Sequence, residues 1–157
     1  MLKLKFKRIT IKDMDEISHF EIRQADLNEM RVVSGSNKPL ATLLKSAIER
    51  STEWVEICLD NNTGEVYTIY GLGNCEGFGV PWMIGSPSIT KHKKDLLQYS
   101  KLIIKEMLNQ FPLIHNYVDS RNKAHIRWLK HMGFNFYDER DFVINGVPFK
   151  YFYKCRE

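Results

Sequence analysis

The sequence lacks several features that would place it in a specialised class. None of its hydrophobic runs is long enough to span a bilayer. Its three cysteines are Cys58, Cys75 and Cys155. They show no Cys-x-x-Cys spacing, and no histidines are spaced His-x-x-x-His, so we expect no metal site. We interpret the odd number of thiols as reduced cysteines, which is typical of a cytosolic protein.

Other absences limit the organisation and the chemistry. No repeat, low-complexity tract or linker divides the 157 residues, so one domain spanning residues 1–157 is expected. There is no P-loop and no Ser-His-Asp set. The net charge of +4 is too mild and too evenly spread to indicate a nucleic-acid partner. From Leu2 to Ile9 hydrophobic and basic residues alternate, which predicts a half-buried strand and not a signal peptide.

What is present is the periodicity of an α+β domain. Asp13 can cap a short helix, and residues 40–48 and 96–111 carry hydrophobic stripes at helical spacing. Asn61-Asn62-Thr63-Gly64 predicts a hairpin turn. The predicted strands are 2–9, 54–59, 65–70, 78–84, 113–118, 134–137 and 147–153. Together with a family resemblance, these elements give the order β-α-α-β-β-β-α-β-α-β-β. Periodicity alone indicates an α+β fold with a mixed sheet.

The segment from Asn116 to Phe134 carries the most specific pattern. It reads NYVDSRNKAHIRWLKHMGF: a strand, an asparagine that can cap a helix, and a helix that stops at Gly133. This pattern resembles the C-terminal half of the GNAT fold, the fold of a large superfamily of N-acetyltransferases. The resemblance implies a central mixed sheet flanked by helices. It also implies that this sheet is splayed between the strands Gly79–Gly85 and Leu113–Val118.

In GNAT enzymes an acyl-coenzyme A lies between the two splayed strands, so the resemblance implies acetyl-CoA as cofactor. It implies that the first strand, at Met83 and Ile84, meets the pantetheine arm. It also implies that the pyrophosphate lies at the N-terminus of the next helix, where free N–H groups favour an anion. The cofactor-binding residues expected by resemblance are Met83, Ile84, Lys91, Lys93, Lys94 and Asn122.

Two of these expectations have plainer alternatives. The family's usual loop, Arg/Gln-x-x-Gly-x-Gly/Ala, is replaced by residues 86–94, which contain no glycine. Lys93 and Lys94 lie in the first helical turn, where cations oppose the helix dipole unless an anion is bound. The alternative is a solvated basic turn offset by Asp95. For Asn122 the alternative is a simple N-cap.

The residues that would perform the chemistry stay unassigned. The family's helix reads Asn-x-x-Ala-x-x-Leu-Tyr-x-Lys-x-Gly-Phe, and its Tyr protonates the departing thiolate. Counted back from Gly133, Leu129 takes the place of this Tyr and His125 that of the Ala. Three carboxylates fall in segments that line the acceptor side in the family, and the alternative is that they are ordinary surface groups. They are Asp26, Glu29 and Glu76.

A closer resemblance covers roughly residues 77–154. The run HNYVDSRNKAHIRWLKHMGFNFYDE and the aromatic terminal hairpin look like the GNAT-like proteins of tailed bacteriophages, including the internal virion protein A family. This resemblance implies two alternative roles. One is an acyl-CoA-dependent N-acyltransferase with weak or lost activity, acting on an amine in the bacterial cytoplasm. The other is a virion or assembly component without catalysis, whose partners are phage structural proteins.

Overall fold

The computed structural model describes residues 3–17 and 19–157, so Leu2 of the predicted first strand lies outside the described residues. Within the described residues, eight strands form one sheet in the order β1-β2-β3-β4-β5-β8-β6, and β7 also pairs with β8. All pairs are antiparallel except β4 with β5. The strands are β1 Leu4–Ile9, β2 Trp54–Asp60, β3 Val66–Cys75, β4 Phe78–Gly85, β5 Leu113–Asp119, β6 Asn135–Phe136, β7 Phe142–Ile144 and β8 Val147–Cys155.

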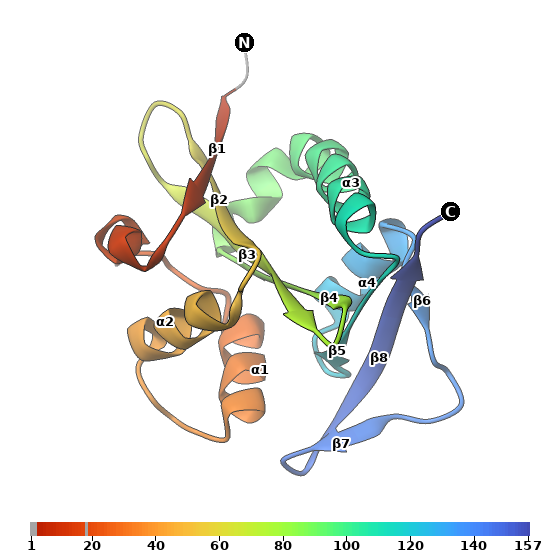
Figure 1. The fold of residues 1–157 in the computed structure, drawn as a ribbon. Coiled ribbons are helices and arrows are strands. Elements are labelled where there is room, and N and C mark those ends of the chain that lie inside the picture. The colour runs from red at the N-terminus through yellow and green to blue at the C-terminus, as the bar shows by residue number, and fades with distance from the viewer. Residues whose placement is uncertain (1–2, 18) are drawn as a thin grey trace.

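Helices cover both faces of the sheet, which confirms the predicted α+β class with a central mixed sheet (Figure 1). The helices are α1 Gln24–Ser34, α2 Leu40–Arg50, α3 Lys93–Gln110 and α4 Lys123–His131, with 3₁₀ turns η1 Ile11–Ile17 and η2 Pro87–His92. The core around Leu72 and Ile114 joins the sheet to α3 and α4. The core around Ile57 and Ile69 joins the opposite face to α2 and η1. No helix in the described part of the chain is long and apolar enough to cross a membrane.

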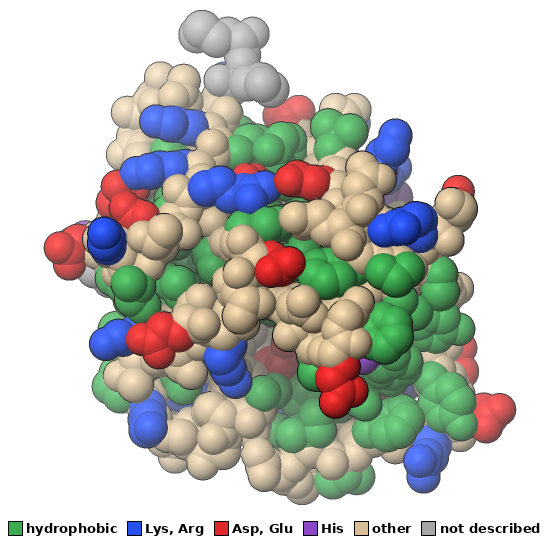
Figure 2. Space-filling view, in the orientation of Figure 1, with side chains coloured by type: hydrophobic (Ala, Val, Ile, Leu, Met, Phe, Trp, Pro, Cys, Tyr) green, Lys and Arg blue, Asp and Glu red, His purple; other side chains and the backbone are tan. Residues whose placement is uncertain are grey.

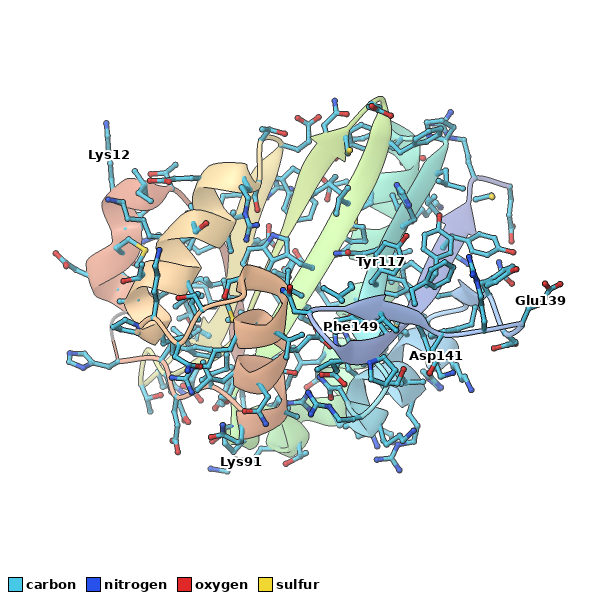
Figure 3. The ribbon with its side chains drawn as sticks, turned by 90° about the horizontal axis from the view of Figure 1, so that it is seen from below. Lys12, Lys91, Tyr117, Glu139, Asp141 and Phe149 are labelled. Carbon is cyan, nitrogen blue, oxygen red and sulfur yellow. The ribbon has the colours of Figure 1, made fainter. Side chains whose placement is uncertain are left out.

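Over β5 and β8, one face of the sheet has no helix on it (Figure 1). Aromatic side chains lie there in a continuous group. Tyr117 of β5 is directly opposite Tyr151 of β8, and their ring centroids are 5.2 Å apart. Phe142 of β7 lies 5.6 Å from Tyr117, and His115 lies 5.6 Å from Tyr151. Hydrophobic side chains gather on this side in Figure 2, and Figure 3 shows Tyr117 beside the β7–β8 hairpin. We call this group the aromatic face.

The structure differs from the sequence prediction at three elements: η1, α1 and β7. Residues 11–17 form a 3₁₀ turn and not a helix capped by Asp13. Thr10 Oγ1 accepts from the Lys12 N–H at 3.3 Å, while the Asp13 carboxylate accepts from the Thr10 N–H at 2.8 Å. Helix α1 was not predicted at all. Strand β7 was also missed; a turn at Asn145 and Gly146, both with positive φ, joins it to β8.

Candidate functional site

Strands β4 and β5 part from each other after a single residue pair. They are parallel, and Gly79 opposite Ile114 is the one matched pair between them. Gly79 permits this close approach, because a Cβ on it would lie 2.8 Å from the Ile114 side chain. Further along, a side chain bridges the strands: Asn116 Nδ2 donates to the carbonyl of Pro81 at 2.8 Å. The predicted splay is therefore present.

The backbone N–H and C=O groups of one β4 residue, Met83, face this gap. Backbone groups on an antiparallel strand alternate between its two edges. On the edge that faces β5, the Pro81 carbonyl accepts from Asn116. On the same edge the Gly85 N–H donates to Asp26 at 2.8 Å. Met83 lies between Pro81 and Gly85, so its N–H and C=O also face the gap.

The other predicted strand residue, Ile84, is oriented differently. Its carbonyl accepts from Thr68 Oγ1 of β3 at 2.7 Å, so its backbone groups are turned away from the gap. Its side chain is buried in the core on the α2 side, although it also lines the cavity described below. Contact with a cofactor stays a prediction for both residues; the backbone groups of Met83 face the gap, and those of Ile84 do not. Pro81 turns its missing N–H towards the gap, so the β3–β4 register is continuous through it.

Helix α1 closes the open end of the gap with a buried carboxylate. Asp26 is 3% exposed, so its oxygens must find partners within the protein. One oxygen accepts from the Gly85 N–H at the end of β4. The other accepts from Asn122 Nδ2 at 3.0 Å, just before α4, and Arg23 forms an ion pair with the same group at 2.8 Å. The carboxylate thus ties together α1, β4 and the start of α4.

Glu29, one turn further along α1, faces the end of β5. Its Oε1 accepts from the Asp119 N–H at 2.8 Å. Burial raises the pKa of Glu29 to about 7, and the negative charges of Asp26 and Asp119 act in the same direction. The side chain lines the cavity. A carboxylate with a pKa near neutrality is suited to general-base chemistry. Of the three candidate bases, Asp26 is fully engaged, and Glu76 lies exposed in the β3–β4 turn with φ of 53°.

A cavity of about 690 Å³ passes through the gap. Its lining residues come from α1 and α2 on one face of the sheet and from α3 and α4 on the other. The two faces connect at β4: Trp82 donates to Ser51 at the end of α2, whereas Met83 packs against the core next to α3 and α4. Figure 2 shows the surface hollowed near the centre of the α1–α2 face. Two ligands could therefore approach the gap from opposite faces.

The start of α4 presents a buried histidine to the cavity. Asn122 caps α4 by accepting from the His125 N–H at 3.4 Å, and it is 2% exposed. The N-cap role is therefore present, and contact with a cofactor stays a prediction. His125 is itself 7% exposed and lines the cavity. Burial lowers the pKa of His125 to about 4, so the ring is neutral at pH 7. Leu129, one turn later, also lines the cavity and has no proton to give.

The three lysines lie where β4 leads into α3. Lys91 lies in the last turn of η2, and Lys93 and Lys94 begin α3, which has no side-chain cap at its N-terminus. All three are exposed and none lines the cavity. Figure 3 shows Lys91 on the outside of the molecule, away from Tyr117 and the aromatic face. The geometry is that of an open anion site at a helix N-terminus or of a solvated basic turn. No group of side chains in the described part of the chain could hold a metal ion.

Sequence reasoning missed two features of this site. It did not single out Met83 over Ile84, because the direction of a backbone group depends on strand register. It assigned no role to His125, which had no partner at a recognisable spacing. The one available signal was its place, three residues after a capping asparagine, where a polar side chain faces inward.

Comparisons with solved structures define the fold class. The chain is similar to the ribosomal-protein-S5-alanine acetyltransferase from Vibrio fischeri, with a TM-score of 0.68 and 13% identity over 99% of this chain and 94% of that one. It is similar to spermidine N-acetyltransferase from Vibrio cholerae in complex with CoA and spermine, with a TM-score of 0.67, 13% identity and coverage of 98% and 95%. It is also similar to aminoglycoside acetyltransferase AAC(6′)-Ib in complex with coenzyme A, with a TM-score of 0.68 and 14% identity over 98% of this chain and 95% of that one. The fold is therefore the GNAT fold.

The sequence itself defines a narrower family. A family model described as "Bacteriophage T7, probable scaffold protein Gp13" matches residues 58–141, more than half of the chain. The chain belongs to this family. No curated protein sequence matches it.

Proposed function

We propose that the protein binds an acyl-coenzyme A, with acetyl-CoA as the expected ligand, in the gap between β4 and β5. This proposal rests on the N–H and C=O groups of Met83, which face a cavity that runs through the sheet. An extended arm of amide groups can pair with such an edge as a further strand would. Two GNAT neighbours were solved with CoA bound. The pyrophosphate would then lie near Lys91, Lys93 and Lys94.

The same geometry supports the following steps of acetyl transfer. An amine would enter from the α1–α2 face and attack the thioester carbonyl carbon. A carbon–nitrogen bond forms, the carbon–sulfur bond breaks, and the amine proton passes to the carboxylate of Glu29. The leaving thiolate must still be protonated, and Leu129 cannot supply the proton. A positioned general acid contributes about 10²–10⁴-fold to such a rate. Transfer by this protein is therefore slow or lost.

A second function is favoured by the family match. In this alternative the protein is a structural or assembly component of a phage particle, of the type of internal virion protein A, which keeps the fold without the reaction. The family description names a probable scaffold protein. The aromatic face supports the alternative, because exposed hydrophobic patches often mark interaction sites. Its partners would be phage structural proteins, either in the host cell or in the virion.

Two measurements on the wild-type protein separate these functions. Titration calorimetry with coenzyme A and with acetyl-CoA tests binding, and release of free thiol in the presence of spermine or lysine tests transfer. Binding with slow or undetected thiol release supports a cofactor site with weak or lost activity. Absence of binding to either ligand contradicts the acyl-CoA proposal and leaves the structural role.

A further inference from the structure

His125 carries a buried polar atom that the free protein leaves without a partner. Among the described residues, two buried side-chain atoms lack a hydrogen bond, Nε of Arg31 and Nδ1 of His125. Arg31 has two other nitrogens, whereas a neutral imidazole has one N–H and one lone pair to satisfy. Buried polar atoms are nearly always paired, so each exception calls for an explanation.

The surroundings of this atom point to a ligand. His125 lies in the first turn of α4, beside the Asp26–Asn122 bond that closes the gap, and Asp26 and Arg23 are near enough to influence its pKa. His125 is one of the residues that line the cavity, together with Met83. The neighbouring wall residues of α4 are Trp128 and Leu129, whose side chains offer no acceptor. A polar group of a bound molecule is therefore a suitable partner for Nδ1.

We propose that Nδ1 of His125 donates a hydrogen bond to a carbonyl oxygen of the acyl-coenzyme A arm. This inference rests on the proposed function and adds a specificity contact to it. The candidate oxygens are the amide carbonyls of the pantetheine and the thioester carbonyl, which share the same acceptor chemistry. A neutral imidazole can hold its proton on either nitrogen, and a carbonyl next to Nδ1 selects the Nδ1–H tautomer. His125 is thus a binding residue and not an acid that protonates the thiolate.

Three substitutions separate this role from simple packing. His125→Leu keeps the approximate volume and removes every polar atom. His125→Asn keeps a hydrogen-bonding group near the position of Nδ1, and His125→Gln moves it towards the position of Nε2. The free energy of unfolding of each free protein is measured in urea, and the affinities for coenzyme A and acetyl-CoA are measured by calorimetry.

We expect His125→Leu to leave the unligated protein as stable as the wild type or more stable, because no hydrogen bond is lost. The affinity for acetyl-CoA falls about tenfold in His125→Leu and His125→Gln, the effect of one lost hydrogen bond. The affinity of His125→Asn for acetyl-CoA stays closer to that of the wild type. A loss confined to acetyl-CoA identifies the thioester carbonyl as the acceptor, and an equal loss with coenzyme A identifies a pantetheine amide.

Other results overturn the inference. Unchanged affinities in His125→Leu refute the contact while the proposed acyl-CoA site stands. A clear loss of stability in unligated His125→Leu shows that the ring already has a partner in the free protein, such as an ordered water, and also refutes it. If the wild-type protein binds neither ligand, the proposed function fails and this inference fails with it.

Discussion

The carboxylate of Asp26 should be one of the most sensitive points of the fold. It accepts from the Gly85 N–H, from Asn122 Nδ2 and from Arg23, and it is almost fully buried. Replacing it with alanine leaves two buried donors and part of a guanidinium without partners. Removing one partner of a buried pair typically costs about 3–5 kcal/mol. We therefore expect Asp26→Ala to lose about 3–5 kcal/mol of a total stability that is commonly about 5–15 kcal/mol.

Urea unfolding followed by circular dichroism measures this loss directly. For a chain of this size, a loss of about 3–5 kcal/mol lowers Tm by about 6–20 °C. Asp26→Asn should lose less stability, about 1–3 kcal/mol. Its amide oxygen can still accept one hydrogen bond, but its NH2 group would face another donor. Asp138→Ala, at an exposed position, is the control and should stay within about 0.5 kcal/mol of the wild type. A loss below about 1 kcal/mol in Asp26→Ala refutes the account of α1 as the closure of the gap.

Three further outcomes follow from the site. Because burial raises the pKa of Glu29 from 4.5 to about 7, the folded protein keeps a proton there that the unfolded chain has lost at intermediate pH. Stability should therefore rise as the pH falls from about 7 towards 4.5, and Glu29→Gln should flatten this slope in urea titrations. Leu129→Tyr should raise the rate of thiol release by about 10²-fold or more if the rest of the site is competent; an efficient wild-type rate would instead reveal another acid. Replacing Lys93 and Lys94 together with alanine should weaken acetyl-CoA binding by about 1–3 kcal/mol and reduce its salt dependence, and unchanged calorimetric affinity excludes phosphates at this turn.

The sequence predicted the elements whose local signals agree with their tertiary role. Helix α3 carries an amphipathic stripe, and the structure places it at Lys93–Gln110, close to the predicted span. The β2–β3 hairpin has its turn at Asn61–Gly64, and α4 has its cap at Asn122. In each case the local preference of the backbone and the burial pattern point to the same structure.

Helix α1 was not predicted because its buried residue is polar, whereas a helix is usually recognised by a buried hydrophobic stripe. Asp26 is the one residue of this helix that is buried, and its hydrophobic residues are only partly covered. Its N-cap, Arg23, makes no side-chain capping bond. The helix is held by hydrogen bonds to the ends of β4 and β5, and these depend on residues distant in the sequence. A hydrophobic periodicity search has no signal to find in such a segment.

If the backbone N–H of Met83 receives the ligand, a substitution that removes this N–H must weaken binding. Met83→Pro removes the N–H that faces the gap and spares the hydrogen bonds to β3, as Pro81 already does two residues earlier. Met83→Leu is the matched control, because it changes the side chain and keeps the N–H. Calorimetry with acetyl-CoA should show binding to the wild type and Met83→Leu, and about tenfold weaker binding to folded Met83→Pro. Equal affinity in all three proteins, or no binding in any, would contradict the account.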